Sequence, residues 1–275
     1  MGDVARRPID QAHRDAVTGI HGIVRANTSS VGFGVGVLAA ITSATGCVAI
    51  GSSALAANTT GISNVAIGSS ALAANITGGG SVAIGHLAAA LCTVSDIVAV
   101  GANALTANTT GAGCTAVGAN ALKANTTGAE SVAVGYGALM ANTTGRDSTS
   151  VGYASLYANT TGGYHVAVGR NAGRFLADGT TANQAGTYGT YVGYGVRAGA
   201  AGAANETAIG NGAIGGGSNT VRLGNTAVTN WLPGATNVCA LGNATTAFTA
   251  LYLSDGTDEY ALTVNTSGAL VITKQ

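Results

Sequence analysis

The sequence predicts an all-β fold, a left-handed parallel β-roll or β-solenoid with coils of about 17 residues. Two observations carry this prediction. The phrase VAIGSSALAANTTG, residues 48–61, returns almost unchanged as VAIGSSALAANITG at residues 65–78. A period held this closely over most of a chain indicates stacked repeats, each of which buries its apolar face on the next. The glycine that ends VAIG recurs at Gly34, Gly51, Gly68, Gly85, Gly101, Gly118, Gly135, Gly152, Gly169, Gly193, Gly210 and Gly224.

The composition also favours a repeat over an ordinary globular domain. Charged residues make up 8% of the 275 residues, and the chain has 44 glycines but only 5% aromatic residues. With so few aromatic residues, the core must consist of Ala, Val, Ile and Leu and must be thin, as it is in stacked coils. The formal net charge is zero, so nothing in the charge balance suggests binding to nucleic acid. No segment approaches the length of about 18 apolar residues that membrane insertion needs.

Each repeat reads as two short strands and two turns. Val48 and Ile50 flank an alanine, and this alternation predicts a strand whose two large side chains face the interior. Gly51 then turns the chain, Leu55 fills the core, and Asn58 begins an Asn-Thr-Thr-Gly turn rather than a glycosylation site. Equivalent residues of successive coils should stack about 4.8 Å apart in ladders, so about twelve coils would form a rod about 55 Å long.

Two coils depart from the pattern. The coil after Gly85 reads HLAAALCTVSDI and lacks the Asn-Thr-Thr-Gly turn. The coil after Gly169 is longer and contains LADGTTANQAGTYG. Insertions into a solenoid form loops on one face, and that face is often the binding face. We therefore expect recognition at these two coils and at the two ends of the chain.

Several phrases resemble the repeats of a known class of surface proteins. They are ALAANTTG, ALKANTTG, SLYANTTGGYHVAVG, NAGRFLADGTTANQAG and NETAIGNGAIGGGSNTVRLGN, which lie within about residues 30–225. These repeats are similar to the heads of YadA-type trimeric autotransporter adhesins and, more closely, to the shafts of bacteriophage tail and head fibres. The resemblance implies a homotrimer of left-handed β-rolls that reads a surface and has no catalytic activity.

The resemblance is compatible with two biological roles, a bacterial adhesin and a virion fibre. The adhesins have a signal peptide, a coiled-coil stalk and an outer-membrane anchor, and the sequence shows none of these patterns. We therefore expect a virion fibre, on the head or the tail, that is assembled in the host cytoplasm and attaches the particle to a host surface glycan or protein. A bacterial trimeric adhesin is the alternative. A tailspike-like polysaccharide depolymerase is less favoured, because it needs paired carboxylates and the chain has only 11 acidic residues.

The two ends leave the period of the shaft, which covers residues 30–225. Within residues 1–29, IDQAHRDAVTGIHGIVRA has apolar residues at helical spacing and much of the chain's charge, which predicts a partly helical anchor for a capsid or tail protein. A solubilising cap is the alternative. The candidate anchor residues are Arg6, Arg7, Ile9, Arg14 and Ile20.

The C-terminal segment, residues 226–275, also leaves the period. Its sequence predicts strands around turns at 255–256 and 267–268, which would form either a receptor-binding tip or a cap.

Residues able to perform chemistry are sparse. The four histidines lie at no metal-ligand spacing, and we expect His86 and His165 to be exposed or at an interface. The four cysteines form no CxxC pair, and Cys47 and Cys114 share a repeat position with small residues, which favours free thiols. We predict no catalytic residue, no metal and no cofactor.

The positions of the tyrosines in the repeat indicate a contact surface. Three of them directly follow the repeat glycine, with Arg170 at the matching position between them. Aromatic side chains with a polar tip are common where surfaces bind partners. Two interpretations stay open, that these side chains contact a receptor or that they wedge between protomers at the trimer seam. The candidate residues are Tyr136, Tyr153, Tyr157, Tyr194, Trp231 and Tyr252.

Overall fold

The computed structural model describes residues 29–228 and three further strands at 251–254, 259–264 and 270–274. The chain divides into two compact units, Met1–Ala227 and Val228–Gln275. The candidate anchor residues and Trp231 lie outside the described residues. The predicted N-terminal anchor and its partner therefore stay predictions.

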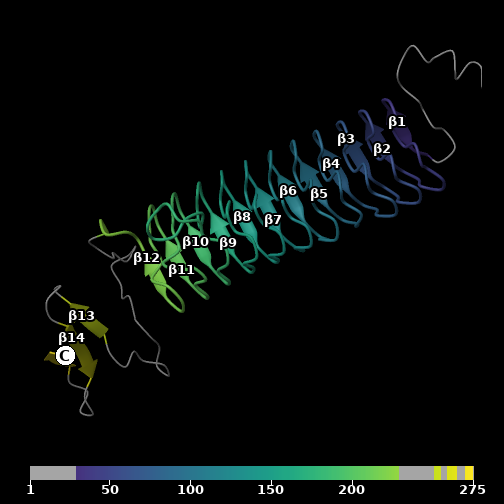
Figure 1. Ribbon diagram of the computed structural model, residues 1–275. Coiled ribbons are helices and arrows are strands. Elements are labelled where there is room, and N and C mark those ends of the chain that lie inside the picture. Colours follow the sequence, from purple (N-terminus) through teal and green to yellow (C-terminus); the bar gives the residue numbers. More distant parts are fainter. Residues whose placement is uncertain (1–28, 229–250, 255–258, 265–269, 275) are drawn as a thin grey trace, which may run out of the picture. The chain divides into compact units, whose positions relative to one another are not determined.

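Residues 29–228 form a parallel β-solenoid, which confirms the predicted fold class (Figure 1). The prediction of two strands in each repeat is wrong, because each coil contributes one strand and the segment around the leucine forms turns. Twelve strands of three residues each pair in sequence order into one parallel sheet, and the described residues contain no helix. The strands are β1 (Val31–Phe33), β2 (Val48–Ile50), β3 (Val65–Ile67), β4 (Val82–Ile84), β5 (Val98–Val100), β6 (Thr115–Val117), β7 (Val132–Val134), β8 (Thr149–Val151), β9 (Val166–Val168), β10 (Thr190–Val192), β11 (Thr207–Ile209) and β12 (Val221–Leu223).

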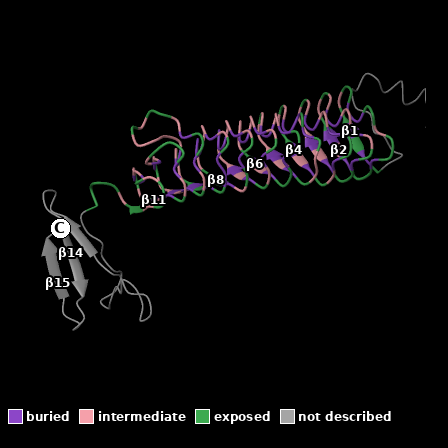
Figure 2. Cartoon of the chain, turned by 60° about the horizontal axis from the view of Figure 1, so that its bottom comes forward, coloured by how far each residue is buried: buried purple, intermediate pink, exposed green. Residues whose placement is uncertain are grey.

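Equivalent residues of successive coils stack directly on one another. Val48 lies opposite Val65 and Ile50 opposite Ile67, and the same register continues through the sheet. The predicted leucine column is confirmed, because each of its members is at most 1% exposed. Figure 2 shows buried residues recurring from coil to coil along the interior. The column consists of Leu38, Leu55, Leu72, Leu105, Leu122, Leu139 and Leu156.

The prediction that Val48 and Ile50 face the interior is wrong. The middle residue of the strand, Ala49, is fully buried, whereas Ile50 is 40% exposed. The leucine column is the physical reason. A Cβ atom at Gly32, the middle residue of β1, would lie only 3.1 Å from Cδ1 of Leu38. Space beneath the sheet is thus so limited that a methyl group such as that of Ala49 fills it, and the larger Val and Ile side chains project outward.

The glycine that follows each strand lets neighbouring coils approach closely. Gly101 has a φ of +137°, and a Cβ atom there would lie 2.5 Å from the carbonyl carbon of Gly118 in the next coil. No other residue fits this combination of conformation and contact. Leu55 also has a positive φ, 49°, and the complete burial of its side chain holds this sparsely populated conformation.

The Asn-Thr-Thr-Gly turns form the predicted ladder inside the solenoid. Nδ2 of Asn75 donates hydrogen bonds to Oδ1 of Asn58 over 3.3 Å and to the carbonyl oxygen of Gly78 over 2.9 Å. Both asparagine side chains are fully buried. The buried amides thus stabilise the turns, as predicted.

In the coil after Gly85, different residues stand at the leucine and the asparagine positions of the repeat. Ala89 takes the place of the leucine, since its N–H donates to Ala104 as that of Leu72 does to Ala88. Cys92 takes the place of the asparagine, and Nδ2 of Asn108 lies 3.5 Å from its sulfur. Ile97 is fully buried before β5, where the preceding coil has a serine. The side chain of Ile97 supplies apolar volume in the coil that has Ala89 in place of the column leucine.

The second unit contains a three-stranded antiparallel sheet of β13 (Leu251–Ser254), β14 (Glu259–Val264) and β15 (Leu270–Lys274). The pairs Ser254–Glu259 and Val264–Leu270 lie on either side of the two positions where turns were predicted. Tyr252 lies opposite Ala261 in this sheet. Its role in a tip or a cap stays a prediction.

Candidate binding surfaces

The described part of the chain offers several candidate binding surfaces along the solenoid. Among residues 29–228 and the three C-terminal strands, no group of three or more His, Cys, Asp or Glu side chains could hold a metal ion. No helix there is long and apolar enough to span a membrane. Three cysteines, Cys47, Cys92 and Cys114, are buried free thiols, as predicted. Four features of the solenoid nevertheless stand out.

The first feature is the outer sheet face, which we define as the first and third residues of β2 to β11. Its side chains are all Val, Ile or Thr, and all are half-buried or exposed. Ile50, Val117, Val168 and Ile209 are 37–40% exposed and lie at intervals along the sheet, on β2, β6, β9 and β11. Parallel sheets in proteins are normally covered on both faces. An apolar sheet face of this length is therefore suited to a protein partner.

The second feature is the aromatic row, which consists of Tyr136, Tyr153, Arg170 and Tyr194. The rings of Tyr136 and Tyr153 stack with centroids 5.3 Å apart and planes 12° apart. The guanidinium carbon of Arg170 lies 5.4 Å from the ring centroid of Tyr153 and 5.8 Å from that of Tyr194. Each tyrosine of the row is about half exposed, 48% or more. The structure thus brings together three predicted tyrosines and Arg170.

Tyr157, the fourth predicted tyrosine, lies beside this row in a second cluster. The guanidinium carbon of Arg174 lies 4.6 Å from the Tyr157 ring centroid and 4.7 Å from that of Phe175. The Tyr157 ring packs over Gly137, where an added Cβ atom would lie 3.1 Å from it. The sequence prediction missed Arg174, although it occupies the repeat position of Tyr157 in the next coil.

Tyr157 also ends an apolar groove of about 390 Å³ that crosses several coils. Three of its lining residues are alanines at the same position of three successive coils. The groove is lined by Thr106, Ala107, Lys123, Ala124, Met140, Ala141 and Tyr157.

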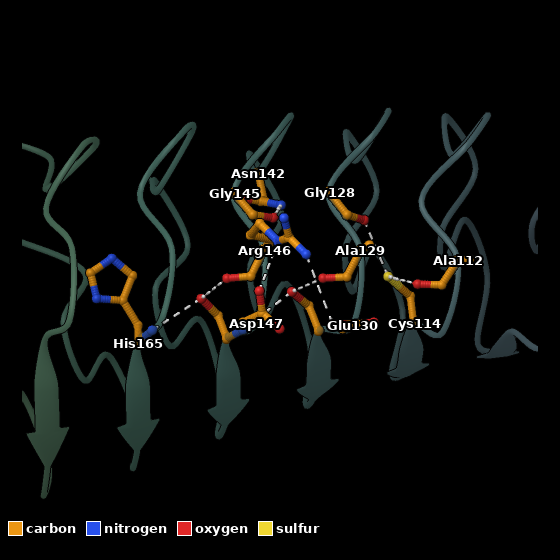
Figure 3. A network of polar contacts seen from close by, with 12 residues as sticks. Ala112, Cys114, Gly128, Ala129, Glu130, Asn142, Gly145, Arg146, Asp147 and His165 are labelled. Atoms are coloured by element: carbon orange, nitrogen blue, oxygen red, sulfur yellow. Dashed lines mark hydrogen bonds and ion pairs between the residues drawn. The ribbon is translucent and has the colours of Figure 1, made fainter.

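The third feature is the pre-strand column, formed by the residue before each strand (Figure 3). Oγ of Ser148 donates to the carbonyl oxygen of Arg146 over 3.2 Å and accepts from the backbone N–H of His165, also over 3.2 Å. Sγ of Cys114 lies 3.3 Å from the carbonyl oxygen of Gly128. These small polar groups satisfy the backbone of neighbouring coils. The column is structural, and beside it Arg146 pairs with Asp147 over 2.8 Å.

The prediction that His165 is exposed or at an interface is wrong, because its side chain is 1% exposed. His86, in contrast, is exposed as predicted. The long coil after Gly169 is the reason, since its residue Gly189 covers the ring and donates its N–H to Nδ1 of His165 over 3.0 Å. Burial lowers the pKa of the imidazole. Nε2 has no hydrogen-bond partner among the described residues.

The fourth feature is a buried carboxylate before β11. Oε1 of Glu206 accepts hydrogen bonds from the backbone N–H groups of Gly199 over 2.9 Å and Gly217 over 2.7 Å, and Oε2 accepts from Tyr191. Tyr191 occupies the alanine position of its strand. Its ring takes the space that Gly173 leaves by replacing the leucine, since a Cβ atom at Gly173 would lie 2.7 Å from it.

The insertion after Gly169 is held by local hydrogen bonds. Oδ1 of Asp178 accepts from the N–H groups of Thr180 and Thr181, both over 2.8 Å, and Oδ2 accepts from the Thr181 hydroxyl. The hydroxyl of Thr181, followed by these two N–H groups, lowers the pKa of Asp178 to about 2. Nη1 of Arg197 donates to the carbonyl oxygen of Ala177 over 2.9 Å and ties the loop to the next coil.

Comparison with protein families, with curated proteins and with solved structures finds no match to this chain. What the chain does must therefore be argued from its own surfaces.

Proposed function

We propose that this chain is a virion fibre protein whose solenoid forms the shaft of a homotrimer, anchored to the particle by its N-terminus, and that the fibre attaches the particle to a host cell surface. The observation that carries the proposal is the outer sheet face. Its apolar side chains line a parallel sheet of twelve strands and are left uncovered by the chain's own residues among those described.

Further copies of the same chain are the occupants that fit this face best. The outer sheet face repeats with the coil spacing, and a second copy presents the same columns at the same spacing. Closed rotational symmetry is the usual arrangement of identical subunits, and it would cover the face in every copy without leaving an open end. The choice of three copies follows from the resemblance to trimeric fibres and adhesins.

The mass of the purified full-length protein in solution tests the assembly. We expect the mass of three chains, whereas a mass of 26.4 kDa, that of one chain, would end the trimer proposal. Val117→Lys places a charge in the middle of the outer sheet face and should reduce the mass. Thr127→Lys, in an exposed turn, is the matched control and should leave the mass of three chains unchanged.

The location of the protein tests the attachment role. Electron microscopy with a specific antibody should label an appendage on virus particles, and the purified protein should compete with those particles for adsorption to cells. Labelling of a bacterial envelope instead would favour the adhesin. Cleavage of host capsule by the isolated protein would favour the depolymerase.

The proposed anchor has its own test. Deletion of residues 1–25 should abolish incorporation into particles and leave the circular-dichroism spectrum of the β-solenoid in place. Normal incorporation of the deleted protein would refute the anchor.

A further inference from the structure

We propose that one flank of the solenoid binds an acidic polysaccharide, an inference that rests on the proposed attachment function and names the chemistry of the host surface. We define the cation–aromatic flank as the aromatic row together with Tyr157, Arg174 and the groove beside Tyr157. The row and the second cluster are contiguous, because Arg174 donates to Oδ1 of Asn171, the neighbour of Arg170, over 3.2 Å.

The arginines of this flank lack acidic partners. Among the described residues, the ion pairs between side chains involve Arg146, with Glu130 and Asp147. Arg170 has no hydrogen-bond acceptor there, and Arg174 has only the amide of Asn171. Each guanidinium group therefore keeps several N–H donors for a ligand. Planar guanidinium groups bind carboxylates and sulfates through paired hydrogen bonds, so the flank is complementary to an acidic ligand.

Both guanidinium groups are held in place before any ligand binds. Arg170 lies between the rings of Tyr153 and Tyr194, and Arg174 lies between those of Tyr157 and Phe175. Cation–π contacts of this kind fix the group, and the ligand then loses less affinity to the ordering of side chains. The tyrosines stand on stacked coils, so their spacing is set by the β-ladder.

The groove indicates a sugar chain rather than a peptide. The alanines that line it have no free backbone donors, because the N–H groups of Ala107, Ala124 and Ala141 donate to the next coil over 3.0–3.1 Å. The carbonyl groups of an extended peptide would find no main-chain donors at these alanines, so a full β-type ladder cannot form there. Sugar rings need none, since their C–H faces pack on apolar and aromatic surface and their substituents bind polar groups. Lys123, which also lines the groove, adds a third cation.

Nucleic acid fits the flank less well than an acidic polysaccharide. Binding to a phosphate backbone draws on many cations at once and is favoured by a basic protein. This flank has three cations on a chain with a formal net charge of zero. Sparse cations set among aromatic rings suit a polymer that carries one acidic group among several apolar sugar faces.

Binding of the full-length protein to immobilised polysaccharides tests the inference. The probes are polygalacturonate, which carries carboxylates, dextran sulfate, which carries sulfates, and neutral dextran. We expect binding to one or both acidic polymers and none to dextran, and the preferred polymer identifies the acidic group. Arg170→Gln combined with Arg174→Gln should weaken binding about tenfold or more. The matched control Arg146→Gln removes a charge that is already paired and should bind as the wild type does.

Several outcomes would overturn the proposal. They are equal binding to dextran, an unchanged affinity in the double variant, or stronger competition by single-stranded DNA than by the acidic polymers. A double variant with a changed mass in solution would place these residues at the seam between protomers and refute an open binding flank. If the protein competes with particles for cells but binds no acidic polysaccharide, the attachment function stands and this inference fails.

Discussion

The hydroxyl group of Tyr191 donates a hydrogen bond to Oε2 of Glu206 over 3.2 Å, and both side chains are fully buried. Burial, followed by the charge of Glu206, raises the pKa of the Tyr191 hydroxyl, so the tyrosine remains a donor at any ordinary pH. This pair spans two coils at the place where the repeat is most irregular. It replaces the leucine and alanine packing of the regular coils with a specific polar contact.

Removal of this hydroxyl should destabilise the solenoid. Tyr191→Phe keeps the ring that fills the space above Gly173 but leaves Oε2 of Glu206 buried without its donor. Loss of a hydrogen bond to a charged group typically costs about 1.5–3 kcal/mol in the free energy of unfolding. Urea unfolding followed by circular dichroism measures the difference.

Glu206→Gln is the matched comparison for this pair. Its carbonyl oxygen can still accept from Gly199 and Gly217, its amide can donate to Tyr191, and no charge is buried. We expect a change within about 1 kcal/mol. A loss from Glu206→Gln as large as that from Tyr191→Phe would show that the charge itself stabilises the coil.

The stability of the solenoid should fall as the pH is lowered towards 5, because of His165. The folded state lowers the pKa of this imidazole, whose Nδ1 is occupied by the N–H of Gly189, while the unfolded chain keeps a pKa near 6.5. The unfolded state therefore binds more protons below this pH. Stability is fully present above pH 6.5 and declines below it by up to about 1.4 kcal/mol per pH unit. The free energy of unfolding measured from pH 7.5 to 5 checks this.

His165→Asn should flatten that dependence, since Asn64 occupies the same repeat position with its hydrogen bonds satisfied. His86→Asn, at an exposed position, should retain the wild-type slope. Tyr191 lies close to His165, with ring centroids 6.2 Å apart, and Glu206 lies behind it. The variant Glu206→Gln in the same titration separates the contribution of that carboxylate. An unchanged slope in His165→Asn would exclude the imidazole as the cause.

Period and turn chemistry made most of the solenoid predictable. A strict repeat fixes which residues stack, so the leucine column and the Asn58–Asn75 contact followed from spacing alone. The direction of Val48 and Ile50 did not, because alternation in a three-residue strand is equally consistent with large side chains inside or outside. The available width decides this, and that width depends on how closely Leu38 approaches the sheet.

The residues of the candidate binding surface could be predicted only where they share one position of the repeat. Tyr136, Tyr153 and Tyr194 share one position in the period and lie in one row. The contacts of His165, Tyr191 and Glu206 arise where the coil after Gly169 breaks the period. There the register with the next coil is unknown from sequence, so neither the burial of His165 nor its contact with Gly189 could be foreseen.

Replacement of the repeat glycine should be among the most destabilising changes in the shaft. In Gly101→Ala the new Cβ atom would lie 2.5 Å from the backbone of Gly118, at a φ of +137°. Neither coil can move away without breaking the β-ladder on both sides. We expect a loss of more than about 3 kcal/mol, or no folded protein.

Gly195→Ala separates the clash from the backbone conformation. Gly195 also has a positive φ, +60°, but an added Cβ atom would meet no atom within 4 Å. This variant should lose only about 1–2 kcal/mol. Thermal unfolding of the two variants side by side measures the contrast, and equal losses would mean that contact between coils contributes nothing at Gly101.

Two buried positions of the asparagine ladder, Asn125 and Cys92, differ in the hydrogen bonds that they make to neighbouring coils. Nδ2 of Asn125 donates to Oδ1 of Asn108 over 3.0 Å and to the carbonyl oxygen of Gly128 over 2.8 Å, and its Oδ1 accepts from Asn142 over 2.8 Å. Asn125→Ala removes all three of these buried hydrogen bonds. Oδ1 of Asn108 keeps only the N–H of Gly111, and Nδ2 of Asn142 keeps only the carbonyl oxygen of Gly145. We expect a loss of at least about 2–3 kcal/mol in the free energy of unfolding.

Cys92→Ala tests the corresponding rung where the ladder is interrupted. The sulfur of Cys92 has only long contacts, 3.5 Å to Nδ2 of Asn108 and 3.8 Å to the carbonyl oxygen of Val94. Because a thiol is a weak donor and acceptor, the loss should stay near 1 kcal/mol. If both alanine variants lost the same free energy in urea unfolding, the ladder would stabilise the turns through side-chain volume. A larger loss at Asn125 assigns that stabilisation to the amide hydrogen bonds that join one coil to the next.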